Sequence, residues 1–241
     1  MLTTTLSDIK AHSLCEGVWV ILLKGLGVTS ANKNPLPLER ILEICGFGYA
    51  ESALTTVQGH DGAIRLFSCY CARYSLDIFE RKYPDDQRPR QAIEIAERFA
   101  WGKATREELT AAYAAASDAY DAVDAAARAA QRAIRSELAA GGAAMTTPVD
   151  FVANDAAVAV MAVMAAVDAA KAVMSAADFA SDAAGHAAAY AAEAEGVERH
   201  AAQMAAQAAK AAAKINFIRE FIRLCRLEGE YGEVDKLDNQ K

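Results

Sequence analysis

The densest group of polar side chains in the sequence lies in a short segment between two predicted helices. The group consists of Tyr83, Asp85, Asp86, Arg88 and Arg90. Guanidinium groups beside the N-terminus of a helix can bind a phosphate or a carboxylate. The aspartates can instead cap the helix while the arginines pair with them, and this second interpretation is the favoured one.

Arg65 is a further candidate for the same binding cluster. It lies with His60 and Asp61 near the other end of a predicted helix of roughly twenty residues, and the fold could bring either end near a neighbouring element. The candidate ligand- or partner-binding residues predicted from the sequence are therefore Arg65, Tyr83, Asp85, Asp86, Arg88 and Arg90.

Other reactive residue types do not form a recognisable site. Asp118, Asp121 and Asp124 are spaced three apart and could hold a divalent cation, but without an accompanying histidine motif a solvated helix face is the favoured interpretation. Cys69 and Cys71 would point about 200° apart on a helix and could not chelate one metal. We recognise no Ser/His/Asp constellation, Walker loop or paired-carboxylate motif, and we predict no catalytic residue, metal or cofactor.

Charge and hydropathy argue against several classes of function. The 241 residues include 25 basic and 32 acidic side chains, scattered along the chain with a net charge of −7, so nucleic-acid binding is not expected. Five cysteines at irregular spacing, without a cleavable signal peptide, predict reduced thiols in the cytoplasm. The most apolar stretch, residues 156–167, is too short to cross a bilayer, so no membrane span is expected.

The composition changes near residue 104 and predicts two helical regions. Residues 1–103 are mixed, with bulky apolar side chains, whereas alanine dominates residues 104–241. Alanine has the highest helix propensity, and its small side chain lets helices approach closely over many turns. We therefore predict an all-α, multi-helix bundle in which a mixed N-terminal helical region precedes long, alanine-rich antiparallel helices, with both regions packed as one unit.

Capping residues indicate where helices of the first region begin. We expect Ser7 or Asp8 to cap the first helix and Asp61 to cap the helix that contains Arg65. Between them, residues 28–37 are predicted to form a loop.

Similar signals mark the alanine-rich region. Thr105 and Glu108 have the pattern of a capping box, at the start of a helix predicted to run to about residue 140. Thr147 and Pro148 predict the start of the next helix.

Gly185 is expected to kink or interrupt that helix near its end, and a last helix is predicted over about residues 186–227. An alanine that faces a neighbouring helix, for which we choose Ala126, should not tolerate leucine. Helices of this length allow a homo-oligomer, but no heptad seam is recognised that would specify one.

Three blocks of sequence resemble one known family. They are residues 65–73 (RLFSCYCAR), 83–94 (YPDDQRPRQAIE) and 104–109 (ATREEL), followed by an alanine tract. Together they resemble the helical "putative immunity protein" family of bacteria and their phages, and residues 12–17 and 22–27 are similar to the lead-in of phage-encoded members. The resemblance implies an all-helical fold, neutralisation of a partner toxin, and no cofactor.

These observations favour a non-enzymatic interaction protein of the bacterial cytoplasm. The leading hypothesis is an immunity-type or phage counter-defence inhibitor that sequesters a protein target, either a toxin or a component of a bacterial conflict system. A second hypothesis is a protein that sequesters an anionic metabolite or nucleotide at Arg65, Arg88 and Arg90. The third is an enzyme whose chemistry the sequence does not reveal.

Overall fold

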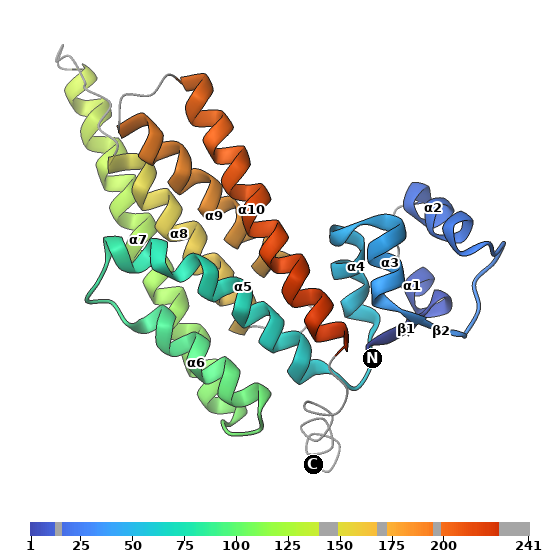
Figure 1. Cartoon of the computed structure of the whole chain (residues 1–241). Coiled ribbons are helices and arrows are strands. Elements are labelled where there is room, and N and C mark those ends of the chain that lie inside the picture. The colour runs from blue at the N-terminus through green and yellow to red at the C-terminus, as the bar shows by residue number, and fades with distance from the viewer. Residues whose placement is uncertain (13–15, 140–148, 168–172, 195–198, 227–241) are drawn as a thin grey trace.

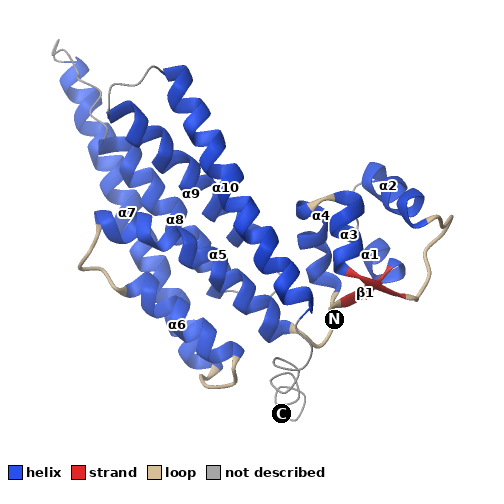
Figure 2. Cartoon of the chain, viewed as in Figure 1, coloured by secondary structure: helices blue, strands red, loops and turns tan. Residues whose placement is uncertain are grey.

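The structure, a computed structural model, describes residues 1–12, 16–139, 149–167, 173–194 and 199–226. Apart from two three-residue strands, its elements in these ranges are helices, which confirms the predicted all-α class (Figure 2). Figure 1 shows a group of short N-terminal elements beside a bundle of longer helices that run alongside one another.

The short elements occupy the first quarter of the chain. They are β1 (Thr3–Thr5), α1 (Leu6–Ala11), α2 (Glu16–Leu26), β2 (Pro35–Pro37), α3 (Leu38–Cys45), α4 (Phe47–Ala53) and the 3-10 turn η1 (Leu54–Thr56). β1 and β2 pair in antiparallel register, with Thr3 opposite Pro37. The prediction of a loop over residues 28–37 is therefore wrong for its last three residues. Proline lacks a backbone N–H and is depleted in strands, so this segment carries no strand pattern.

The predicted caps of the first region differ from the observed ones. Thr5, rather than Ser7 or Asp8, caps α1: its hydroxyl accepts a hydrogen bond from the backbone N–H of Asp8 (3.1 Å) and donates one to the Asp8 carboxylate (2.7 Å). His60 occupies the N-cap position of the next long helix, and Asp61 is the first helical residue. There its negative charge still lies where the helix dipole favours it.

Three longer helices follow, namely α5 (Asp61–Lys82), α6 (Arg88–Ala100) and α7 (Arg106–Ala139). The predicted capping box at the start of α7 is confirmed. The backbone N–H of Thr105 donates to Glu108 Oε2 (2.7 Å), and the backbone N–H of Glu108 donates to Thr105 Oγ1 (3.1 Å). Two otherwise unpaired amides are thus satisfied at this helix start.

The alanine-rich region continues with α8 (Val149–Val167), α9 (Val173–Ala194) and α10 (Arg199–Arg226). α8 and α9 are separate helices that pack against each other, and Gly185 does not break a helix: it lies inside α9. A Cβ atom at Gly185 would collide with the side chain of Lys210 on α10, so the glycine allows these helices to approach closely. Thr147 and Pro148 lie outside the described residues.

One buried cluster extends from the N-terminal elements into the bundle, from Leu2, the residue before β1, to Phe221 on α10. At its centre the rings of Phe67 and Phe221 meet edge-on, with centroids 5.9 Å apart. None of the helices in the described ranges is both long and apolar enough to span a membrane.

The buried face of α7 is lined by small side chains. Ala112, Ala116, Ala119 and Val123 recur at helical spacing and are buried. Ala126 continues this spacing but is exposed, so its predicted inward orientation is wrong. Figure 1 shows the reason, because the C-terminal part of α7 extends beyond its neighbours.

Candidate functional site

Five of the six predicted site residues lie in or beside the turn that joins α5 to α6. Tyr83 is half-buried, and its ring packs against that of Phe79 with centroids 5.3 Å apart. Burial raises the pKa of the Tyr83 hydroxyl, so it stays protonated at neutral pH. Asp85, two residues further on, is exposed. The turn therefore places one of these side chains partly against the core and the other in solvent.

Asp86 and Arg88 form a compact ion pair at the start of α6. Asp86 Oδ1 accepts hydrogen bonds from the backbone N–H (3.1 Å) and Nε (2.9 Å) of Arg88, and Oδ2 accepts one from Nη2 (2.6 Å). The guanidinium holds the pKa of Asp86 below its usual range, mainly through these side-chain hydrogen bonds. Gln87, rather than an aspartate, occupies the N-cap position and makes no side-chain cap hydrogen bond, whereas Asp86 accepts from the first helical N–H and neutralises the arginine.

Arg90 turns away from this pair and binds the preceding helix. Its Nε and Nη2 donate to Oε1 (2.6 Å) and Oε2 (2.5 Å) of Glu80 on α5. A second bidentate pair, which the sequence analysis did not identify, joins the same helices: Arg73 Nε and Nη2 donate to Glu97 Oε1 (2.6 Å) and Oε2 (2.8 Å). Both arginines have raised pKa values because of these hydrogen bonds. Two bidentate arginine–glutamate ion pairs therefore join α5 to α6.

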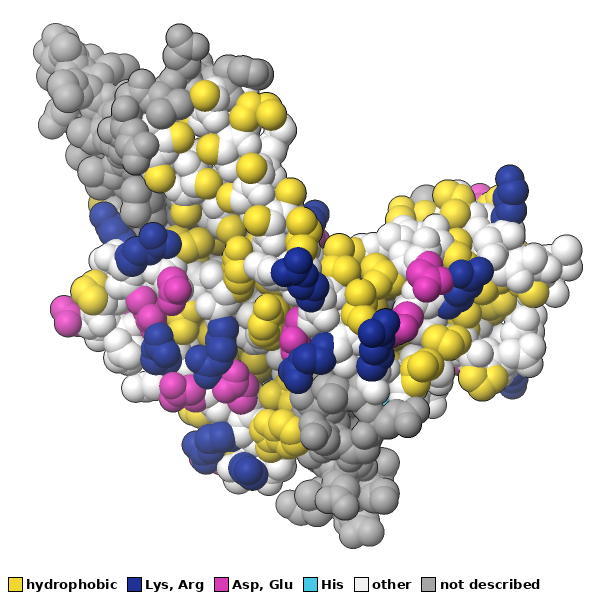
Figure 3. Space-filling view, viewed as in Figure 1, with side chains coloured by type: hydrophobic (Ala, Val, Ile, Leu, Met, Phe, Trp, Pro, Cys, Tyr) yellow, Lys and Arg dark blue, Asp and Glu magenta, His cyan; other side chains and the backbone are white. Residues whose placement is uncertain are grey.

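The two pairs define one polar surface of the α5–α6 hairpin. Asp77 and Glu94 occupy the helical positions between the pairs, and both are exposed. We call this surface the hairpin face, and its residues are Arg73, Asp77, Glu80, Arg90, Glu94 and Glu97. Figure 3 shows basic and acidic side chains interspersed in this part of the molecule. Partly exposed ion pairs of this kind contribute about 0.2–1 kcal/mol each to the free energy of unfolding. These pairs therefore affect the relative orientation of α5 and α6 more than the stability of the protein.

A sequence signal for these pairs exists in retrospect. Glu80 and Arg90 are equally far from residue 85 at the centre of the turn, and so are Arg73 and Glu97. Antiparallel helices joined by a tight turn bring such equidistant positions side by side. Opposite charges at both pairs of positions would have predicted the contacts.

Arg65 is not part of this surface. It is buried, and its Nη1 donates to the backbone carbonyls of Val167 (2.7 Å) and Ala166 (3.3 Å) at the C-terminal end of α8. Its guanidinium also lies over the ring of Phe99, 5.3 Å from the centroid. Arg65 is about 27 Å along α5 from Tyr83, at 1.5 Å per residue, so the structure does not bring it to the turn. Its position instead satisfies carbonyls at a helix C-terminus.

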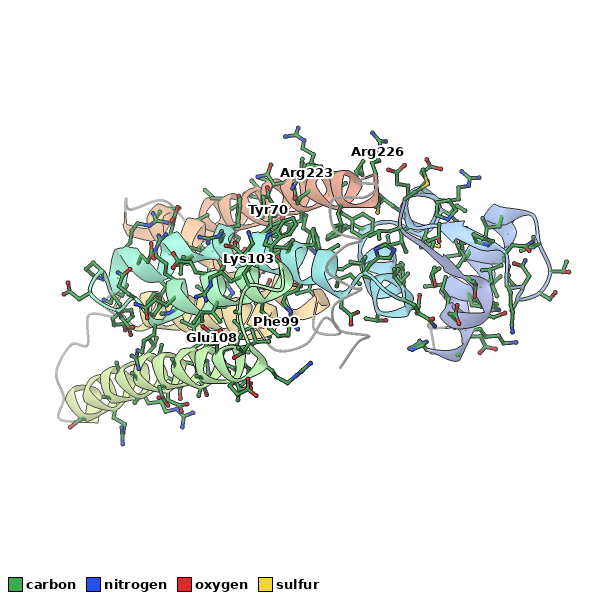
Figure 4. All side chains as sticks on the ribbon, turned by 90° about the horizontal axis from the view of Figure 1, so that it is seen from below. Tyr70, Phe99, Lys103, Glu108, Arg223 and Arg226 are labelled. Atoms are coloured by element: carbon green, nitrogen blue, oxygen red, sulfur yellow. The ribbon has the colours of Figure 1, made fainter. Side chains whose placement is uncertain are left out.

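A second polar group lies where α6 passes into α7. Arg98 Nη2 donates to the carbonyl of Lys103 (3.2 Å) and to Glu108 Oε1 (3.2 Å). The backbone amide of Thr105, followed by Arg98, lowers the pKa of Glu108. Figure 4 shows Lys103 and Glu108 gathered near Phe99, at this junction, with Arg223 and Arg226 on α10 at the other edge of the view.

A buried carboxyl on α4, Glu51, was not singled out by the sequence analysis. It is 3% exposed, and its Oε1 has no hydrogen-bond partner in the described part of the chain. Burial, with a smaller contribution from the charge of Asp178 on α9, raises the pKa of Glu51 to about 9 against the opposing effect of Lys214 on α10. Glu51 is therefore a neutral acid at pH 7, at a place where α4 packs against α9.

The cysteines of α5 are buried in the core. Burial raises the pKa of Cys69 to about 12 and that of Cys71 well above its usual range, so neither is a reactive thiolate at neutral pH. Within the described ranges no three His, Cys, Asp or Glu side chains are close enough together to hold a metal ion.

The fold and the hairpin face define an all-α protein whose clearest polar feature is a helical hairpin held by matched ion pairs. Residues 54–147, which begin at η1 and include α5, α6 and α7, match the sequence model of the family described as Imm-5 like putative immunity protein. The match confirms the resemblance indicated by the motifs within residues 65–109, and it covers less than half of the chain. Searches of curated proteins and of solved structures gave no match to the chain.

Proposed function

We propose that this protein is a non-enzymatic, immunity-type inhibitor that acts in the bacterial cytoplasm by sequestering a protein target, either a toxin or a component of a bacterial conflict system. The observation that carries the proposal is the match of residues 54–147 to the Imm-5 like family. An inhibitor of this kind needs a rigid exposed surface that is complementary to its target, and it needs no reacting group.

The hairpin face supplies such a surface within the matched segment. Its two bidentate pairs hold four charged side chains in fixed positions, so less side-chain entropy is lost when a partner binds. Between them the exposed carboxylates of Asp77 and Glu94 offer a negative centre flanked by Arg73 and Arg90. Alternating charge of this kind favours one partner and one orientation over others.

The alternative function, sequestration of an anion at Arg65, Arg88 and Arg90, has less support. Arg65 is bound to backbone carbonyls, and Arg88 and Arg90 are each bound to a carboxylate. The three guanidinium groups also face three different surroundings. An anion would have to displace an existing partner from each of them, and that cost opposes binding.

The experiment is purification of the tagged, full-length protein from its native bacterial background under non-denaturing conditions, with mass spectrometry of bound proteins and small molecules. We expect one stoichiometric protein partner. The variant Asp77→Lys/Glu94→Lys should lose it, because two charges at the centre of the hairpin face are reversed. Glu16→Lys on α2, also an exposed acid, is the matched control and should retain the partner.

Two outcomes would contradict the proposal. Recovery of no stoichiometric protein would argue against an inhibitor that works by sequestration. Recovery of a bound anion or nucleotide without protein would favour the alternative function.

A further inference from the structure

α10 has two apolar faces, of which the core uses one. The buried face consists of Ala202, Ala213, Phe217, Phe221, Leu224 and Cys225. It packs against α9, α5 and α3. At 3.6 residues per turn, a second apolar stripe lies about 140° around the helix from the centre of this face. An ordinary surface helix has one apolar stripe and a polar opposite side, so the second stripe needs an explanation.

The second stripe has the spacing of a heptad seam. Its residues alternate at intervals of four and three, and we call them the α10 seam: Met204, Ala208, Ala211, Ile215, Ile218 and Ile222. Met204 is 52% exposed and Ile215 is 50% exposed. Ala208 and Ala211 are exposed as well, whereas Ile218 and Ile222 are half-buried. This seam is not evident from the sequence, because the inward apolar residues of the same helix obscure its period.

Charges beside the α10 seam have one sign. Lys214 and Arg219 lie at the two positions that flank the seam, one on each side, and both are exposed. Arg223 and Arg226 follow toward the end of the helix, where they pair with Glu220 and with Glu39 on α3, and Glu220 is the only acid of α10. Figure 3 shows this pattern, with apolar side chains along α10 and basic side chains toward the end nearest the short N-terminal elements.

We propose that the α10 seam is a docking surface for an amphipathic helix of a partner protein that carries acidic residues on both sides of its apolar stripe. Apolar residues of that helix would pack between those of the seam, and its carboxylates would pair with Lys214 and Arg219. A second copy of this chain fits less well, because its own α10 would bring further cations and only one acid. This proposal deepens the proposed function and rests on it only in taking the protein to act by binding another protein.

The test uses the purified full-length protein and two synthetic peptides. Both are amphipathic helices of three heptads with leucine at the a and d positions, and they carry glutamate or lysine at the e and g positions. Fluorescence anisotropy should show that the glutamate peptide binds about tenfold more tightly than the lysine peptide. Lys214 and Arg219 attract the glutamate side chains of the first peptide and repel the lysine side chains of the second. Raising the salt concentration should reduce this difference.

Two variants separate the seam from nonspecific binding. Ile215→Lys should weaken binding of the glutamate peptide about tenfold or more, because it puts a charge into the apolar contact. Ile21→Lys on α2 is the matched control, since Ile21 is 53% exposed, and it should bind like the wild type. Circular dichroism shows whether both variants keep their helical fold.

Three results would overturn the proposal: equal binding of the two peptides, binding that Ile215→Lys leaves unchanged, or no binding of the glutamate peptide. A wild-type dimer in analytical ultracentrifugation that Ile215→Lys converts to a monomer would also overturn it, and would assign the seam to self-association. Because the peptides do not depend on the cellular target, the proposed function can fail in the purification experiment while this proposal holds, and the reverse.

Discussion

The buried carboxyl of Glu51 predicts an unusual dependence of stability on pH. In the folded protein its pKa is raised to about 9, whereas in the unfolded chain it returns to its ordinary value of 4.5. Between these two values the folded state binds one more proton than the unfolded state. The free energy of unfolding therefore falls as pH rises, by about 1.4 kcal/mol per pH unit for this group. Between about pH 5 and pH 7 the loss is about 3 kcal/mol.

Replacing this carboxyl by its uncharged analogue should remove the effect. Glu51→Gln keeps the shape and polarity of the side chain but cannot ionise, so the unfolded state no longer gains from losing a proton. We expect the variant to unfold with nearly the same free energy as the wild type at about pH 5 and to be more stable by about 3 kcal/mol at pH 7. Urea unfolding followed by circular dichroism across this pH range measures the difference.

The difference between variant and wild type isolates Glu51 from the other titrating groups. Asp86, for example, has a lowered pKa, so its contribution to stability is lost as pH falls through that lowered value, which is the opposite direction. Glu94→Gln changes an exposed carboxyl on α6 and serves as the control, with a difference that should stay flat. If the Glu51→Gln difference is equally flat from pH 5 to 7, the carboxyl does not carry its proton in the folded state and the reasoning is refuted.

Three further predictions concern packing and charge. Arg65→Met should destabilise the protein by about 2–4 kcal/mol in urea unfolding, because the carbonyls of Ala166 and Val167 lose their donor; a loss under about 0.5 kcal/mol would show that they are satisfied without it. A double-mutant cycle with Glu80→Gln and Arg90→Gln should give a coupling energy of about 0.5–1 kcal/mol that shrinks in high salt, and a coupling near zero would show that this pair does not clamp the hairpin. Ala119→Leu should cost about 1–3 kcal/mol and Ala126→Leu almost nothing, because Ala119 is fully buried and Ala126 is exposed; equal thermal unfolding of the two variants would contradict close packing at Ala119.

Local signals in the sequence predicted the start of a helix well where one pair of nearby residues determines it. Thr105 and Glu108 form the expected capping box, since both partners lie within four residues of each other. The pairing of β1 with β2 joins segments about thirty residues apart and places two prolines in a strand, so nothing local announces it. At Gly185 the local signal misled the prediction. Glycine disfavours a helix, but this tendency is outweighed by the close contact with α10 that the missing side chain permits.

The candidate site was predicted less completely. The turn residues lie together because they adjoin in the sequence, but the partners of Arg90 and Arg73 lie on the other helix of the hairpin, and only the register of α5 against α6 reveals them. Arg65 has a partner on α8, about one hundred residues away, and no sequence spacing encodes that contact. Glu51 resembles a surface glutamate in the sequence, because α4 packs against α9, more than one hundred residues further along the chain.

The contact at Gly185 helps to fix the axial register of α9 and α10, whose facing surfaces are mostly alanine. Where helices present mostly alanine to each other, sliding one past the other by a turn of about 5.4 Å exchanges one methyl group for another at little cost. The stem of Lys210 crosses α9 where Gly185 has no side chain, and its ammonium group reaches Asp182 at 2.8 Å. Any slip would drive this stem against a methyl group and break the ion pair. The absence of a side chain at Gly185 and the packing of Lys210 against it thus select one alignment of α9 and α10. Other alignments would otherwise be nearly equal in energy.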